Sequence, residues 1–155
     1  MLPLEKMITS KLKAYYHHDN HPLPIVAITD GATNIRRRLN QLNPQGITII
    51  LDWYHLGKKV REFLSMIARN KSEKTDHSKF LFFHLWRGNI EEVLTYLTTK
   101  IKARNPEKLN ELITYFTKHQ SEIINYARRS QAGKTIGSGR MEKGVDARYW
   151  SSSKA

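Results

Sequence analysis

The sequence has no cysteine among its 155 residues, which excludes disulfides, thiol catalysis and zinc sites built on thiolates. It also lacks any apolar run near the roughly 20 residues that a membrane-crossing helix requires, so we expect no membrane partner. Residues 1–6 show neither the charged start nor the apolar core of a signal peptide. These absences predict a chain that works in a reducing, cytoplasmic environment.

Acidic side chains are scarce beside the basic ones. The chain has 14 Asp and Glu against 26 Lys and Arg, which gives a formal net charge of +12. This excess favours a polyanionic partner, nucleic acid before an acidic membrane surface, although an ordinary basic soluble protein can have the same composition. Residues 57–130 alone carry 15 basic and 8 acidic side chains. A surplus of one sign over so long a stretch favours a DNA-facing surface, and with it a nucleoid-associated location.

Strand and helix patterns alternate in the first part of the chain. They predict strands over residues 24–29 and 47–51 and helices over 33–42 and 53–70, after a helical pattern over 4–16. On the helix over 33–42, Ile35 and Leu39 are expected to face inward, with the arginines between them outward. Strand–helix–strand–helix order is typical of parallel strands joined by crossover helices, so the predicted fold class is α/β.

The middle of the chain shows helical periodicity without any strand pattern. The helices are predicted over residues 80–86, 90–101, 106–116 and 121–129. Asn89 and Asn105 stand where N-caps belong, and Pro106 suits a first helical position. We therefore predict an α/β core over 1–71, an all-helical insertion over 72–130, and a last part over 131–155 that holds a further core helix and a tail.

Three acidic residues stand at positions that favour metal chemistry. Asp30 and Asp52 directly follow the two predicted strands, and parallel strands bring such residues to the same edge of a sheet. Clustered carboxylate oxygens are the ligands that Mg²⁺ prefers. Glu142 follows a glycine-rich turn in which Ser138 can cap a helix. A glutamate in that position can equally well serve only the helix dipole.

His55 lies one helical turn after Asp52, so the two residues share a face of the predicted helix. The spacing favours a histidine that orients the site or packs in the core over one that binds a metal directly. Trp53 and Tyr54, which lie between them, are expected to pack in the core.

Other short motifs do not indicate sites of their own. Gly133-Lys134-Thr135 resembles the end of a phosphate-binding loop, but Arg128 stands where that motif needs its first glycine. Gly137-Ser138-Gly139 lacks the leading strand and the third glycine of a dinucleotide fingerprint. The histidines and aspartate over residues 17–21 have no evident spacing for a closed metal site, so a solvated loop is the favoured interpretation.

In their order and spacing, the acidic motifs resemble the catalytic part of bacterial insertion-sequence transposases of the DDE type, close to the Mutator-like branch. The motifs are Thr29-Asp30-Gly31-Ala32, Leu51-Asp52-Trp53-Tyr54-His55 and Gly137-Ser138-Gly139 followed by Met141-Glu142. The resemblance covers roughly residues 22–146, including Leu85-Trp86-Arg87-Gly88. It implies a partial RNase H-like core interrupted by the helical insertion, and DNA transposition by metal-dependent phosphodiester cleavage and strand transfer.

The resemblance also implies roles for individual residues. Asp30 is similar to the family's second catalytic aspartate and Glu142 to its catalytic glutamate, so these two would bind Mg²⁺, with Mn²⁺ as a substitute. Asp52 with His55 is similar to an Asp-x-x-His element that supports the site. DNA phosphates are expected to contact basic side chains, namely Arg36, Arg37, Lys58, Lys59, Arg128, Arg129, Lys134 and Arg140.

The chain departs from the family pattern in two places. No residue corresponds to the family's first aspartate, and the resemblance ends near residues 147–150. We therefore expect a transposase fragment shortened at both ends and inactive alone. Two alternatives stay open: a non-catalytic basic nucleic-acid-binding module, and a regulatory fragment that pairs with full-length transposase or with itself.

Overall fold

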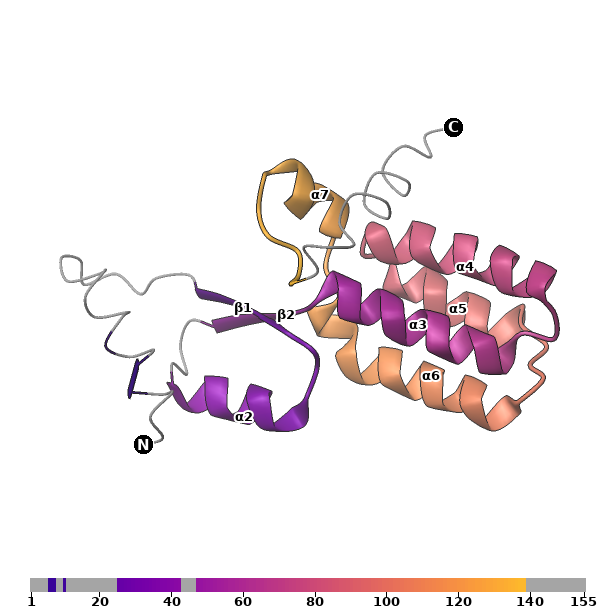
Figure 1. Cartoon of the computed structure of the whole chain (residues 1–155), viewed down its shortest axis with the longest axis horizontal. Coiled ribbons are helices and arrows are strands. Elements are labelled where there is room, and N and C mark those ends of the chain that lie inside the picture. The colour runs from indigo at the N-terminus through magenta and orange to yellow at the C-terminus, as the bar shows by residue number, and fades with distance from the viewer. Residues whose placement is uncertain (1–5, 8–9, 11–24, 43–46, 139–155) are drawn as a thin grey trace.

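The computed structural model describes residues 6–7, 10, 25–42 and 47–138 of the chain. Its elements are β1 (Ile25–Thr29), α2 (Thr33–Leu42), β2 (Ile47–Leu51), α3 (Trp53–Ile67), α4 (Lys71–Trp86), α5 (Ile90–Thr99), α6 (Pro106–His119), the 3₁₀ turn η1 (Gln120–Glu122) and α7 (Tyr126–Gln131). Helices α3 to α6 stack beside one another, the two strands and α2 lie at one end of this stack, and α7 lies near the junction (Figure 1). Lys6, Met7 and Ser10 are helical, and the rest of the helix predicted over 4–16 lies outside the described residues.

The two strands pair in parallel, with Ile25 opposite Ile47 and Thr29 opposite Leu51. The backbone N–H of Asp52 donates to the Thr29 carbonyl at 2.7 Å and extends the pairing by one residue. The described residues therefore form a mixed α/β structure, mostly helical, with a sheet of two parallel strands. The α/β prediction is confirmed at this level, and both strands end at one edge of the sheet.

Helix α3 joins the sheet to the helical stack, since it begins directly after β2 and packs against two other helices. Its apolar face, which includes Leu56, Val60 and Leu64, is fully buried and packs against α4 and α6. At its first residue, the Trp53 ring lies 4.9 Å from those of Trp86 and Tyr126, centroid to centroid. Because each large aromatic removes 150–250 Å² from water, this cluster fixes the start of α3, and with it the end of β2.

The boundaries of two predicted helices are wrong. The helix predicted over 53–70 ends at Ile67, because Ala68 is extended and Asn70 caps the next helix by accepting a 2.9 Å hydrogen bond from the Glu73 N–H. Helix α4 therefore begins at Lys71, well before the predicted start at residue 80. At Asn89 the side chain makes no cap hydrogen bond, whereas Asn105 caps α6 as predicted.

The prediction of a single helix over 121–129 is also wrong. The structure has η1 and α7 there, separated by an extended segment at Ile123. Here Gly88 lies so close to Ile124 and Asn125 that a Cβ on the glycine would stand 2.8 Å from their backbone atoms. This approach and the burial of Ile123 outweigh the helical periodicity of the segment. Asn125 then starts α7 by accepting a hydrogen bond from the Arg128 N–H at 2.9 Å.

Three further observations complete the fold. Ile35, expected to face inward, is 38% exposed, so that prediction is wrong. The described part of residues 72–130 contains no strand, as predicted, while the division into three parts stays a prediction. Among the described helices, none has both the length and the apolar character that crossing a membrane would take.

Candidate functional site

A cavity of about 450 Å³ opens at the edge of the sheet where both strands end. We call it the sheet-edge cavity. Its lining comes from β1 and the turn after it, from the β2–α3 junction, and from a segment much later in the chain: Ile28, Thr29, Asp30, Ile35, Asp52, His55, Thr135, Gly137 and Ser138. Three predicted site residues, Asp30, Asp52 and His55, therefore lie at one cavity.

The Asp30 carboxylate is exposed at this cavity. Its Oδ1 accepts a 2.9 Å hydrogen bond from the Ala32 N–H, which closes the turn into α2. Within this turn, the Gly31 N–H donates to the Thr29 hydroxyl at 3.2 Å. The described residues supply no hydrogen bond to the second oxygen of Asp30, so that oxygen is available to a ligand.

Asp52 differs from Asp30 because its carboxylate is already bound on both oxygens. Its Oδ1 accepts from the backbone N–H groups of Tyr54 and His55 at 2.9 and 3.1 Å, which caps α3. Its Oδ2 accepts from the backbone N–H and the hydroxyl of Ser138 at 2.9 and 2.7 Å. The side chain is only 7% exposed. This geometry gives Asp52 a supporting role in holding three segments together.

The segment over residues 135–138 returns to the sheet edge and lies directly on the β2–α3 junction. The Ile136 carbonyl accepts from the Trp53 N–H at 3.0 Å. A Cβ on Gly137 would lie 2.5 Å from Oδ1 of Asp52, so only glycine permits this approach. The Ser138 hydroxyl donates to Asp52, while the helix that Ser138 was expected to cap lies, with Glu142, outside the described residues, so that cap stays a prediction.

His55 is exposed at the rim of the cavity, so its interpretation as a core residue is wrong. Trp53 is buried in the core, as predicted, and Tyr54 is half-buried against it. Whether His55 orients a ligand stays a prediction.

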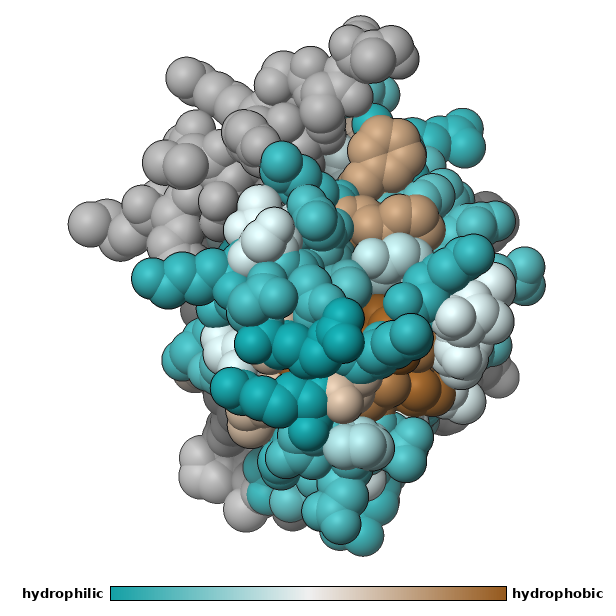
Figure 2. All heavy atoms as spheres, turned by 90° about the vertical axis from the view of Figure 1, so that its right-hand side faces the viewer, coloured by the Kyte–Doolittle hydropathy of each residue, from teal (hydrophilic) through white to brown (hydrophobic). Residues whose placement is uncertain are grey.

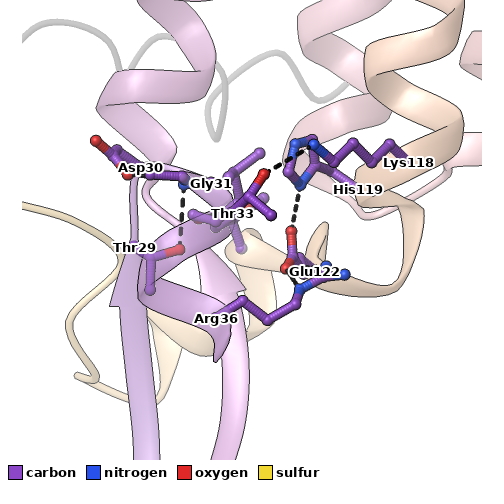
Figure 3. A network of polar contacts seen from close by, with 11 residues as sticks. Thr29, Asp30, Gly31, Thr33, Arg36, Lys118, His119 and Glu122 are labelled. Carbon is purple, nitrogen blue, oxygen red and sulfur yellow. Dashed lines mark hydrogen bonds and ion pairs between the residues drawn. The ribbon is translucent and has the colours of Figure 1, made fainter. Parts of the chain in front are cut away.

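A buried polar network beside the cavity was missed by the sequence analysis (Figure 3). The Glu122 carboxylate is 3% exposed and binds the Arg36 guanidinium on one oxygen and Nδ1 of His119 on the other. His119, in turn, packs against Gly31, where a Cβ would lie 3.1 Å from the ring carbon Cε1. Asp30 lies on the other side of this turn from His119 (Figure 3). The network therefore ties the end of α6 to the turn that presents Asp30.

The basic side chains predicted to bind DNA have different surroundings. Arg36 is paired with Glu122, Lys59 lies over the rings of Phe63 and Tyr115 at 5.9 and 5.7 Å, and Nε of Arg129 donates to the Thr135 carbonyl at 2.7 Å. The exposed ones are Arg37, Lys58, Arg128 and Lys134. Arg140 lies outside the described residues. Hydrophilic side chains also cover most of the face that the helical stack turns away from the sheet (Figure 2).

The described residues do not supply a site for two metal ions. Within them, no three histidine, aspartate or glutamate side chains are grouped so that they could hold a metal. Asp30 offers a carboxylate oxygen, whereas both oxygens of Asp52 are occupied by hydrogen bonds. Any ion at this edge would therefore depend on Asp30 and on ligands from beyond the described residues.

Comparisons of the chain with protein-family models, with curated proteins and with solved structures give no match.

Proposed function

We propose that the chain is a piece of the catalytic domain of a DDE-type transposase, with a partial RNase H-like core, and that it binds DNA without cleaving it. One observation carries this proposal. The third motif behind the resemblance lies far from the other two in the sequence, with Ser138 standing 86 positions after Asp52, yet residues from all three motifs line one cavity at the sheet edge. These residues are Asp30 from the first motif, Asp52 from the second and Ser138 from the third. Parallel pairing of the strands already brings Asp30 and Asp52 to one edge, so it is the return of the third motif to that edge that a chance likeness leaves unexplained.

The exposure and the hydrogen bonds of the two aspartates support different roles for them within this proposal. Asp30 is the exposed carboxylate and would hold Mg²⁺ together with Glu142. A bound Mg²⁺ would supply Lewis-acid polarisation of a phosphodiester and lower the pKa of a bound water. Asp52 instead keeps the returning segment against the start of α3 through its hydrogen bonds. With no counterpart of the first aspartate and with Asp52 occupied, the part of the chain that the structure describes offers too few ligands for two ions, so we expect no cleavage.

One observation favours the second candidate, a non-catalytic nucleic-acid-binding module. Asp52, the more buried of the two aspartates, serves as a helix cap and as an acceptor for Ser138, which needs no metal. In that case the positive charge of the chain alone would bind the nucleic acid. Divalent ions would then only weaken this binding, as other salts do, and would not bind at a specific site.

Titration with Mn²⁺, followed by amide NMR, separates the two candidates. Paramagnetic broadening confined to residues that line the sheet-edge cavity, and lost in Asp30→Ala and Glu142→Gln, supports the transposase proposal. The matched control is Asp76→Ala, which removes an exposed carboxylate from α4 and should leave the broadening unchanged. No localised broadening in a folded, DNA-binding chain would favour the binding module.

A cleavage assay tests the expected lack of activity. The purified chain should bind labelled duplex DNA and leave it intact with Mg²⁺ or Mn²⁺ present. Metal-dependent strand cleavage that disappears in Asp30→Ala would contradict this expectation and assign activity to the chain itself.

A further inference from the structure

A second hollow, of about 260 Å³, lies on α7 and the turn that follows it. It is lined by Ile124, Asn125, Arg128, Arg129, Ala132 and Lys134. We call it the α7 hollow. Three of these six residues are basic and none is acidic. The positive charge of these residues favours the binding of an anion in the α7 hollow.

The turn that carries the cations of the α7 hollow is held in place, and two of the three cations are unpaired within the described residues. The Lys134 N–H donates to the Arg129 carbonyl at 3.1 Å, and Nε of Arg129 donates to the Thr135 carbonyl at 2.7 Å. These bonds fix the turn between the helix and Lys134. The charged groups of Arg128 and Lys134 are exposed and make no hydrogen bond or ion pair with the described residues. Because the backbone that carries Arg128 and Lys134 is already fixed, only these two side chains have to be ordered when an anion binds.

The α7 hollow adjoins the sheet-edge cavity along the chain. Lys134 lines the hollow, while Thr135 and Gly137 line the cavity. An extended chain spans at most about 3.6 Å per residue, and one strand of B-DNA rises 3.4 Å per nucleotide. The two hollows are therefore within reach of phosphates only a few nucleotides apart on one strand.

We propose that the α7 hollow binds a backbone phosphate of the DNA strand that enters the sheet-edge cavity, through Arg128 and Lys134. This inference rests on the proposed function for the placement of the strand. The recognised group is the phosphodiester monoanion of the DNA backbone, which the positive charges of the hollow would bind. The contact therefore positions DNA without reading its sequence.

The first test is a titration of the full chain with inorganic phosphate, against sodium chloride at equal ionic strength. Amide shifts that saturate and cluster at Arg128, Arg129 and Lys134 are expected, and they should disappear in the double variant Arg128→Gln/Lys134→Gln. Shifts spread evenly over the basic residues of the chain would overturn the proposal. Both side chains are exposed, so the variant should keep the wild-type fold, which a circular dichroism melt checks.

The second test measures affinity for a short duplex as a function of salt. The double variant should bind about tenfold more weakly at low salt, with a slope of log K against log salt shallower by about one to two. The matched control is Lys100→Gln/Lys102→Gln, which removes the same charge from the exposed connection after α5, at the far end of the helical stack (Figure 1). Equal losses in the two double variants would overturn the proposal.

A single-stranded oligonucleotide of about four nucleotides separates DNA from free phosphate as the ligand. It should shift the amides of the α7 hollow together with those of Thr135 and Gly137, whereas inorganic phosphate should shift the hollow alone. Shifts with phosphate but not with the oligonucleotide would overturn the DNA assignment. None of these measurements uses a metal or cleavage, so their failure is distinct from failure of the Mn²⁺ titration that tests the proposed function.

Discussion

Ser138 donates two hydrogen bonds to one carboxylate oxygen of Asp52, a residue 86 positions earlier in the chain. The other oxygen of the same carboxylate caps α3. One buried charge thus joins the end of β2, the start of α3 and the segment that leads toward Glu142. Together with the hydrogen bond from the Trp53 N–H to the Ile136 carbonyl, this side chain holds the returning segment at the sheet-edge cavity.

Asp52→Ala should lower the free energy of unfolding by about 2–4 kcal/mol, because it removes a helix cap and the charged acceptor of Ser138. Asp52→Ser is the matched variant: it keeps a capping oxygen on a side chain too short to reach Ser138, and should lose less. Urea denaturation measures both. A loss below about 0.5 kcal/mol for Asp52→Ala would contradict the joining role.

The local elements of the fold could be predicted from the sequence because their signals are local. The β-branched run at Ile47–Leu51 and the helical pattern at Thr33–Leu42 have the bounds that the structure shows. The Pro106 start of α6 and its Asn105 cap were likewise predicted from adjacent residues. The convergence of Asp30 and Asp52 followed from parallel pairing of two neighbouring strands.

Features that depend on distant residues could not be predicted in this way. No local pattern indicates that Arg36 binds Glu122, although His119 and Glu122 at i,i+3 spacing on α6 and η1 could have suggested a polar pair. Gly137 was expected to permit a turn, whereas it permits contact with Asp52. The break at Ile123 arises from tertiary packing, which overrides helical periodicity.

The Glu122 carboxylate should contribute far more to stability than an exposed one in a similar pair. Glu122 and its partner His119 are buried, whereas the side chain of Arg36 is 40% exposed. Glu122→Ala leaves buried His119 and half-buried Arg36 without their acceptor and should cost about 3 kcal/mol. The matched control is Glu111→Ala, which breaks an exposed pair with Lys108 and should cost less than about 1 kcal/mol. Chemical denaturation of both variants tests this, and equal losses would contradict a structural role for the network.

Two buried tyrosine hydroxyls should respond in opposite ways to removal. The Tyr126 hydroxyl donates to the Leu51 carbonyl at 2.7 Å, so Tyr126→Phe leaves that carbonyl unpaired and should cost about 1–3 kcal/mol. The Tyr115 hydroxyl has no hydrogen-bond partner among the described residues, and burial raises its pKa to about 12. Tyr115→Phe should therefore be neutral or slightly stabilising. Thermal and urea unfolding of this pair decide it, and a larger loss for Tyr115→Phe would reverse the assignment.

His77 should make the stability of the helical stack depend on pH. Burial lowers the pKa of this histidine below its ordinary value of 6.5, against a smaller opposing effect of Glu73 and Asp76. The unfolded chain therefore takes up the proton first, and the contribution of neutral His77 is present above pH 6.5 and lost as pH falls through the folded-state pKa.

The free energy of unfolding at pH 7.5 and 5.5, at constant ionic strength, measures this effect. The wild-type chain should lose more stability over that interval than His77→Gln, which cannot titrate. Tyr96→Phe removes the hydroxyl that lies 2.8 Å from Nδ1 of His77 but keeps the ring buried, so it should retain most of the pH dependence because burial is its main cause. If the wild type and His77→Gln lost stability in parallel, the pH dependence would belong to other groups and the burial of His77 would not be its source.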